Sequence, residues 1–281
     1  MDPRILIAVV IGLVLVAFGG FYAALSSRTG DAVLPPARTA MPSGPAVPAV
    51  VPPPPPPPPA PPPMATPASI EAEIALSEHA ELQALLKQNF NGEYNDLIAV
   101  AVRRRNEGVS DQAFGLELDE RIQEIMRGKL RHGVWASMPT IDRLAANEAS
   151  LFHALGTEGA GFCMKMLGKD DTPAQGPQPE SVRQMMRLGT LYRFQAIVEG
   201  MSNTKPVDPL TAEEMRAFEA SLGREGLNLR DVSTGAYLST GSTEPGKPCL
   251  TLETLHLAIA RLSEGTRRKI YAGMFFLGRD K

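Results

Sequence analysis

Residues 139–155, PTIDRLAANEASLFHAL, set the pattern for most of the C-terminal part of the chain. Spacings of three and four residues place the apolar side chains of this segment on one face of a helix. Such a stripe has to be buried against another element. The stripe consists of Ile141, Leu144, Ala145, Leu151, Phe152 and Leu155, with Glu148 as its one charged position. The segment therefore predicts a helix in a packed core.

The same spacing recurs on both sides of this segment and predicts an all-α domain over residues 69–281, with about seven to nine helices. Start signals agree with this period: Ser110 can cap a helix, Ser137 precedes Pro139, and Thr211 with Glu214 forms a capping box. The expected helices are 69–89, 93–107, 111–132, 139–155, 158–168, 180–201, 211–222 and 251–277. The last could break near Gly265, with Thr266 capping a new helix.

Two segments of this domain do not follow the helical period. Residues 169–179 (KDDTPAQGPQP) are polar and predict a loop. Residues 228–249 are rich in turn-forming residues and predict a long loop or a small β-hairpin.

The N-terminal segment 5–25, ILIAVVIGLVLVAFGGFYAAL, carries no charge. A helix of this length covers roughly 30 Å, the thickness of the hydrocarbon core of a bilayer. We therefore expect one transmembrane helix behind a short head, residues 1–4. The alternative is a cleaved signal peptide, but the apolar region of such a peptide is usually shorter than this one.

The orientation of this span does not follow from the flanking charges. Arg4 lies on one side, and Arg28 and Arg38 lie within the flanking window on the other. The short head is typical of a signal anchor, which leaves the head in the cytoplasm and the large domain outside. We expect a single-pass protein of the plasma or inner membrane with an extracytoplasmic C-terminal domain, periplasmic in a Gram-negative cell.

A proline-rich spacer, residues 26–68, follows the span and includes an unbroken proline run at 52–59. Proline fixes φ and lacks a backbone donor, so the segment favours polyproline II and predicts a disordered or semi-rigid stalk. A ligand for an SH3-like domain is the alternative, but basic flanking residues are nearly absent. In layout, residues 1–68 resemble the energy-transducing and secretion proteins of bacterial envelopes. The C-terminal part has no motif of those families.

The two cysteines, Cys163 and Cys249, both lie in the C-terminal domain. In an oxidising compartment they are a candidate disulfide pair. Two buried thiols are the alternative, because two cysteines alone permit either state.

No pattern in the sequence predicts a catalytic residue, a bound cofactor or a metal site. The four histidines form no His-x-x-x-His ligand pair. The glycine-rich segment 156–161 follows a predicted helix rather than a strand, so it predicts a tight turn and not a phosphate loop. Arg103, Arg104 and Arg105 end a predicted helix, where cations complement the helix dipole; contact with an anionic partner is the second interpretation.

These features lead to an expectation about function. The C-terminal domain has 25 basic and 29 acidic residues, and its net charge near −4 argues against a nucleic-acid partner. We expect a membrane-anchored helical domain that acts as a binding or assembly module of the cell envelope and contacts a protein or a cell-wall component. The alternative is an anchored enzyme that acts on an envelope polymer through residues dispersed along the chain.

Overall fold

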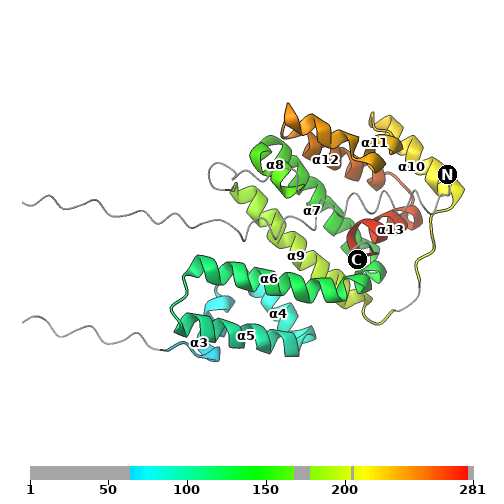
Figure 1. The fold of residues 1–281 in the computed structure, drawn as a ribbon. Helices are drawn as coiled ribbons and strands as arrows, with labels where there is room; N and C mark the ends of the chain where they lie inside the picture. The colour runs from blue at the N-terminus through cyan, green and yellow to red at the C-terminus, as the bar shows by residue number, and fades with distance from the viewer. Residues whose placement is uncertain (1–63, 168–177, 204–205, 278–281) are drawn as a thin grey trace, which may run out of the picture.

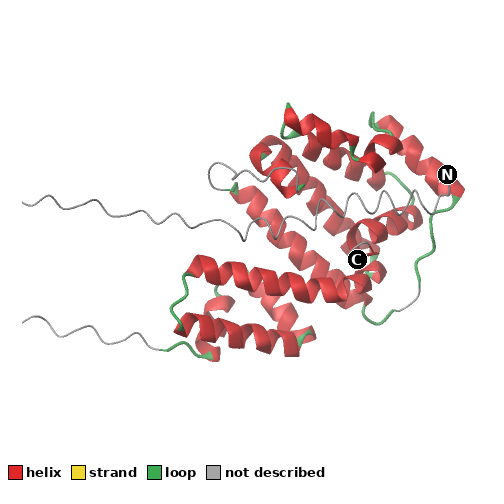
Figure 2. Ribbon diagram, viewed as in Figure 1, coloured by secondary structure: helices red, strands yellow, loops and turns green. Residues whose placement is uncertain are grey.

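The computed structural model describes residues 64–167, 178–203 and 206–277, and this part of the chain is entirely helical (Figures 1 and 2). The expected all-α domain is confirmed for these residues. The expected head and span, residues 26–63 of the spacer and residues 169–177 of the polar loop lie outside them. The α-helices are α3 (Pro67–Ala75), α4 (Ala80–Asn89), α5 (Asn91–Asn106), α6 (Asp111–Lys129), α7 (Met138–Thr157), α8 (Ala160–Met166), α9 (Glu180–Gly200), α10 (Ala212–Arg224), α11 (Leu229–Thr234), α12 (Lys247–Ala260) and α13 (Glu264–Ala272), joined by the shorter helical turns η1 (Leu130–Trp135), η2 (Ala236–Ser242) and η3 (Gly273–Leu277).

Helix α7, which contains the segment 139–155, lies at the centre of the larger part of the fold, between α9 and α12 (Figure 1). Its stripe is buried as expected: Ile141 and Leu144 are fully buried and Leu155 nearly so. Burying side chains of this size stabilises the fold by roughly 2 kcal/mol each. The shared apolar surface of these three helices is therefore a main source of stability.

Helices α3, α4, α5 and α6 form a smaller helical layer beside this centre (Figure 1). The rings of Phe90, after α4, and Phe194, on α9, join the two parts with their centroids 5.9 Å apart. The turn η1 packs closely on the end of α9. An added Cβ on Gly200 would lie 1.8 Å from the carbonyl oxygen of His132, so only glycine fits at this contact.

Several helix starts are those that the sequence predicts. The hydroxyl of Ser110 accepts a hydrogen bond from the amide of Ala113, and Thr211 forms a capping box with Glu214. Ser137 precedes α7, but its side chain makes no capping bond there.

The N-terminus of α7 is held instead by Glu199 of α9. The carboxylate of Glu199 accepts hydrogen bonds from the Ser137 amide at 2.8 Å and the Thr140 hydroxyl at 2.6 Å. Burial raises the pKa of Glu199, but these hydrogen bonds outweigh burial and hold the pKa below its ordinary value. A carboxylate from another helix thus replaces the local cap.

The described residues form eleven α-helices instead of the expected seven to nine, and three of the expected helices are divided. Segment 69–89 is two helices, α3 and α4, because Ser77 bonds through both its amide and its hydroxyl to the carbonyl of Ile74 and ends the first helix. Segment 111–132 ends as α6 at Lys129 and continues as η1. Segment 251–277 breaks after Ala260, where Ser263, and not Thr266, caps α13.

The prediction of a long loop or β-hairpin at residues 228–249 is wrong, since α11, η2 and the start of α12 occupy this segment. Asn228 caps α11, and Gly235, with φ of 66°, ends α11 and connects it directly to η2. The hydroxyls of Thr234 and Thr240 donate to the carbonyls of Arg230 and Tyr237, so the polar residues support short helices.

None of the helices in the described ranges has both the length and the apolar character that a membrane crossing requires.

Candidate functional site

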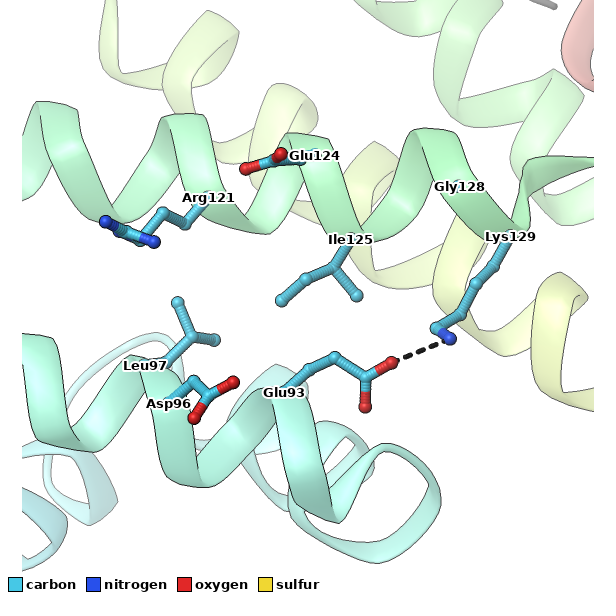
Figure 3. A pocket seen from close by; sticks show the side chains of 8 residues that line it. All are labelled: Glu93, Asp96, Leu97, Arg121, Glu124, Ile125, Gly128 and Lys129. Atoms are coloured by element: carbon cyan, nitrogen blue, oxygen red, sulfur yellow. Dashed lines mark ion pairs between the residues drawn. The ribbon is translucent and has the colours of Figure 1, made fainter.

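A groove between α5 and α6 is the candidate functional site (Figure 3). Its volume is about 320 Å³, which lies within the range of small-molecule and side-chain pockets. It is lined by Glu93, Asp96, Leu97, Arg121, Glu124, Ile125, Gly128 and Lys129.

Helices α5 and α6 form an antiparallel pair. The short turn between them contains Gly108, whose φ of 71° suits glycine, and Ser110 then caps α6. Ion pairs join the opposite ends of the two helices. Lys129 lies 2.7 Å from Glu93 at one end, and Arg104 lies 2.7 Å from Glu117 at the other.

The floor of the groove is apolar. Leu97 points up from α5 and Ile125 points down from α6, so the two side chains face one another across the gap (Figure 3). Leu97 is buried and Ile125 is half-buried. Gly128 leaves the neighbouring space open, because an added Cβ would meet no atom within 4 Å. The groove can therefore accept an apolar group.

The cations of the groove lie at its two ends (Figure 3). At one end, the hydrogen bond from Lys129 lowers the pKa of Glu93, and the Lys129 ammonium also lies 5.3 Å from the centroid of the Phe90 ring. At the other end, Arg121 lies 3.7 Å from Glu117, a carboxylate that Arg104 already holds at 2.7 Å. Lys129 is thus well paired and Arg121 is not.

The Nε–H of Arg121 is buried and has no hydrogen-bond acceptor. A buried donor without an acceptor costs about 1–3 kcal/mol. The remaining carboxylates of the groove, Asp96 and Glu124, are exposed, and neither has an ion-pair partner among the residues that the structure describes. The groove therefore presents a loosely paired arginine and two free carboxylates beside an apolar floor.

The three arginines that the sequence singled out lie in the last turn of α5, which is the end away from the Glu93–Lys129 pair. Arg104 lies 3.0 Å from Glu107 and 2.7 Å from Glu117, while Arg105 lies 2.6 Å from Glu73. Arg103 is exposed. Arg104 and Arg105 are thus paired with carboxylates of the same chain. Contact of the three arginines with an anionic partner stays a prediction.

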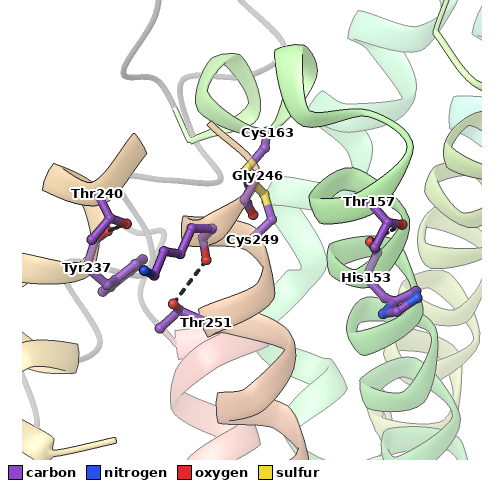
Figure 4. The surroundings of a disulfide bond; sticks show 9 residues. His153, Thr157, Cys163, Tyr237, Thr240, Gly246, Cys249 and Thr251 are labelled. Atoms are coloured by element: carbon purple, nitrogen blue, oxygen red, sulfur yellow. Dashed lines mark hydrogen bonds between the residues drawn. A yellow bond between two sulfur atoms is a disulfide. The ribbon is translucent and has the colours of Figure 1, made fainter. Parts of the chain in front are cut away.

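Cys163 on α8 and Cys249 on α12 form a disulfide, with their Cα atoms 5.9 Å apart (Figure 4). Both cysteines are fully buried. Beside the bond, the backbones of Gly156 and Gly246 touch, since an added Cβ on Gly246 would lie 2.2 Å from the carbonyl oxygen of Gly156. The first glycine of the segment 156–161 therefore has a packing role near the disulfide.

The histidines divide between surface and core. His153 lies 3.1 Å from the carboxylate of Glu253 and is exposed. His256 is buried and packs on the rings of Tyr271 and Phe275. Within residues 64–167, 178–203 and 206–277, no three His, Cys, Asp or Glu side chains are grouped so that they could hold a metal ion.

The sequence does not predict this groove. Leu97 and Ile125 recur at helical spacing with other apolar residues and so predict burial in the core, and the charged residues beside them become their neighbours only after folding. A glycine inside a helical stripe, such as Gly128, is only a weak signal of a packing or functional role, because Gly115 of the same helix looks alike in sequence and does not line the groove. No family model, no curated protein and no solved structure matches this chain.

Proposed function

We propose that this chain is a membrane-anchored binding or assembly module of the cell envelope, with its helical domain outside the cytoplasm. The α5–α6 groove is the surface through which it contacts a partner. The partner is a protein or a cell-wall component.

The anchor rests on the uncharged segment 5–25 and on the proline-rich spacer that follows it. The spacer leads to a well-fixed point of the domain. The side-chain amide of Asn106, at the end of α5, accepts from the Ala65 amide at 2.7 Å and donates to the Ala65 carbonyl at 3.1 Å. A tether that enters at a fixed point would set the position of the domain relative to the membrane.

The compartment is supported by the pair Cys163 and Cys249. Both cysteines of the chain are used in one bond, so no free thiol remains. Structural disulfides are typical of extracytoplasmic proteins and rare in the cytosol. A tethered domain outside the cytoplasm fits this chemistry.

The groove carries the binding part of the proposal. Its apolar floor lies beside two free carboxylates and the partly exposed Arg121 side chain, which is the mixture of apolar anchor and polar rim found in protein contact sites. A carboxyl group with a raised pKa inside the pocket would favour the alternative, an anchored enzyme. In the groove, the hydrogen bond from Lys129 instead lowers the pKa of Glu93.

The test compares two glycines of α6. An added Cβ meets nothing within 4 Å at Gly128, in the groove, or at Gly115, outside it. Leucine at either position also favours the helix. Full-length wild type, Gly128→Leu and Gly115→Leu are cross-linked in their native envelope, and the captured species are identified and re-bound in purified form. We expect a species that wild type and Gly115→Leu capture and that Gly128→Leu loses. Equal capture by all three would contradict the role of the groove.

A further inference from the structure

We propose that the α5–α6 groove receives a peptide segment of a protein partner in which a lysine or arginine adjoins an apolar side chain. The basic group lies beside Asp96, and the apolar side chain rests on Leu97 and Ile125. A backbone carbonyl of the peptide accepts from Arg121. This inference rests on the proposed function and names the chemistry of the partner.

The net negative charge of the groove favours a cationic group on the partner. Three carboxylates and two cations line the groove, so its net charge is negative. Lys129 is neutralised by Glu93 at 2.7 Å and Arg121 lies 3.7 Å from Glu117, so Asp96 and Glu124 are the lining charges without an ion-pair partner among the described residues. Like charges across an interface are repelled and opposite charges are favoured, so an anionic segment would be rejected.

The apolar floor of the groove favours an apolar side chain next to the basic residue of the partner. Leu97 and Ile125 offer apolar surface directly beside Asp96 (Figure 3). Lysine and arginine carry apolar stems that lie along such surfaces while the charged head stays in water. A neighbouring apolar side chain can fill the space that Gly128 leaves open.

Arg121 favours a neutral hydrogen-bond acceptor on the partner. Its side chain is 42% exposed and lies 3.7 Å from Glu117, too far for a hydrogen bond, so its terminal N–H groups can donate to a carbonyl of the peptide. The net negative charge of the groove favours a neutral carbonyl over a carboxylate at this position. The peptide backbone supplies a carbonyl at every residue. A peptide therefore satisfies the cation, the apolar and the acceptor requirements together.

The volume of about 320 Å³ sets the size of the contact. It accommodates one or two side chains and not a folded domain. We therefore expect a short segment that docks weakly alone and gains affinity from the rest of its protein.

The test uses charge reversal with two fluorescent peptides, which carry Lys-Leu-Lys or Glu-Leu-Glu in the same Gly-Ser frame. Binding to the full chain in detergent micelles is followed by fluorescence anisotropy. Wild type and Gly115→Leu should prefer the Lys-Leu-Lys peptide by at least about tenfold, or 1.4 kcal/mol. The variant Asp96→Lys with Glu124→Lys should reverse the preference, and Gly128→Leu should bind neither peptide.

The outcomes separate the two proposals. An unchanged preference in the Lys variant, or equal binding of both peptides by wild type, would overturn the inference about the partner. If capture in the envelope were still lost in Gly128→Leu, the proposed function would stand. If the peptides behaved as expected and no capture depended on Gly128, the inference would stand and the proposed function would fail.

The variant Asp96→Asn with Glu124→Gln removes both charges and adds no new one. It should weaken binding of the Lys-Leu-Lys peptide without reversing the preference. An unweakened affinity would also overturn the inference.

Discussion

Arg193 of α9 donates a hydrogen bond to the carboxylate of Glu148 of α7 in the interior of the domain. Glu148 is 1% exposed, and it is the one charged position in the stripe of segment 139–155. The pair lies 45 residues apart in sequence and joins the two central helices. The negative charge of Glu148 on the core face of α7 is thus compensated by the Arg193 guanidinium and not by water.

Loss of one partner of this pair should destabilise the domain. Arg193→Met leaves a buried carboxylate without a partner, which costs about 3–5 kcal/mol. Chemical denaturation followed by circular dichroism measures the change. The control is Arg187→Met on the same helix, whose partner Glu78 is exposed, with an expected loss of about 1 kcal/mol or less. The double variant Arg193→Met with Glu148→Leu should recover much of the loss. Equal effects of the two single variants would contradict a role of the buried pair.

Removal of the disulfide should lower stability by roughly 4 kcal/mol, because the bond closes a long loop in the unfolded chain. The bonded cysteines are 86 residues apart. Cys163→Ala with Cys249→Ala is compared with wild type by chemical denaturation, with and without reductant. Reductant should bring wild type to the stability of the variant and leave the variant unchanged. A variant as stable as the oxidised wild type would show that the bond does not stabilise the fold.

His256 should make the domain sensitive to acid. Burial, with a contribution from Arg193, lowers the pKa of His256 from 6.5 to about 3. Its ring packs among Phe152, Tyr271 and Phe275, and its Nδ1 atom has no hydrogen-bond partner. Between these pKa values the unfolded chain binds a proton that the folded chain does not. Stability should therefore fall as pH decreases from 6.5 towards 3.

His256→Phe tests this dependence because phenylalanine keeps an aromatic ring and cannot bind the proton. The free energy of unfolding is measured for both proteins from neutral pH to pH 4. The variant should lose less stability on acidification than wild type. Parallel curves for the two proteins would mean that His256 does not contribute to acid sensitivity.

The two hydrogen bonds between the Asn106 side chain and the Ala65 backbone should hold α3 against the rest of the domain. Ile70 is the only residue of α3 that is buried, so α3 depends strongly on this contact and on ion pairs at its surface. Asn106→Ala should raise amide hydrogen exchange in residues 65–75 and lower global stability by about 1 kcal/mol. Asn95→Ala, on the exposed side of the same helix, is the control. Unchanged exchange in α3 would contradict this role.

Much of the fold could be predicted from the sequence, because spacing and capping are local properties. The stripe of α7 and the caps at Ser110 and Thr211 are of this kind. The division of 69–89 at Ser77 was missed, since neither proline nor glycine marks it. The prediction of a loop or hairpin at residues 228–249 is wrong because polar side chains there donate hydrogen bonds to nearby backbone carbonyls. These bonds support short helices.

The candidate site could not be predicted, because it depends on how two helices lie against one another. Asp96 and Arg121 are ordinary surface charges in sequence, and only the packing of α5 on α6 brings them to one groove. The pair Glu148 and Arg193 was missed for the same reason. The cysteines were found because the chain contains only two.

The most direct test of the account concerns the position of the domain, which is proposed to be anchored by residues 5–25 and to face outward. Leu76 is 91% exposed at the turn between α3 and α4, and the wild-type chain has no free thiol. Full-length Leu76→Cys is treated in intact cells with a thiol reagent that cannot cross the plasma membrane, and wild type gives the background. We predict labelling before lysis, with the labelled chain recovered in the membrane fraction. Labelling only after lysis, or a labelled chain free of the membrane, would contradict the account.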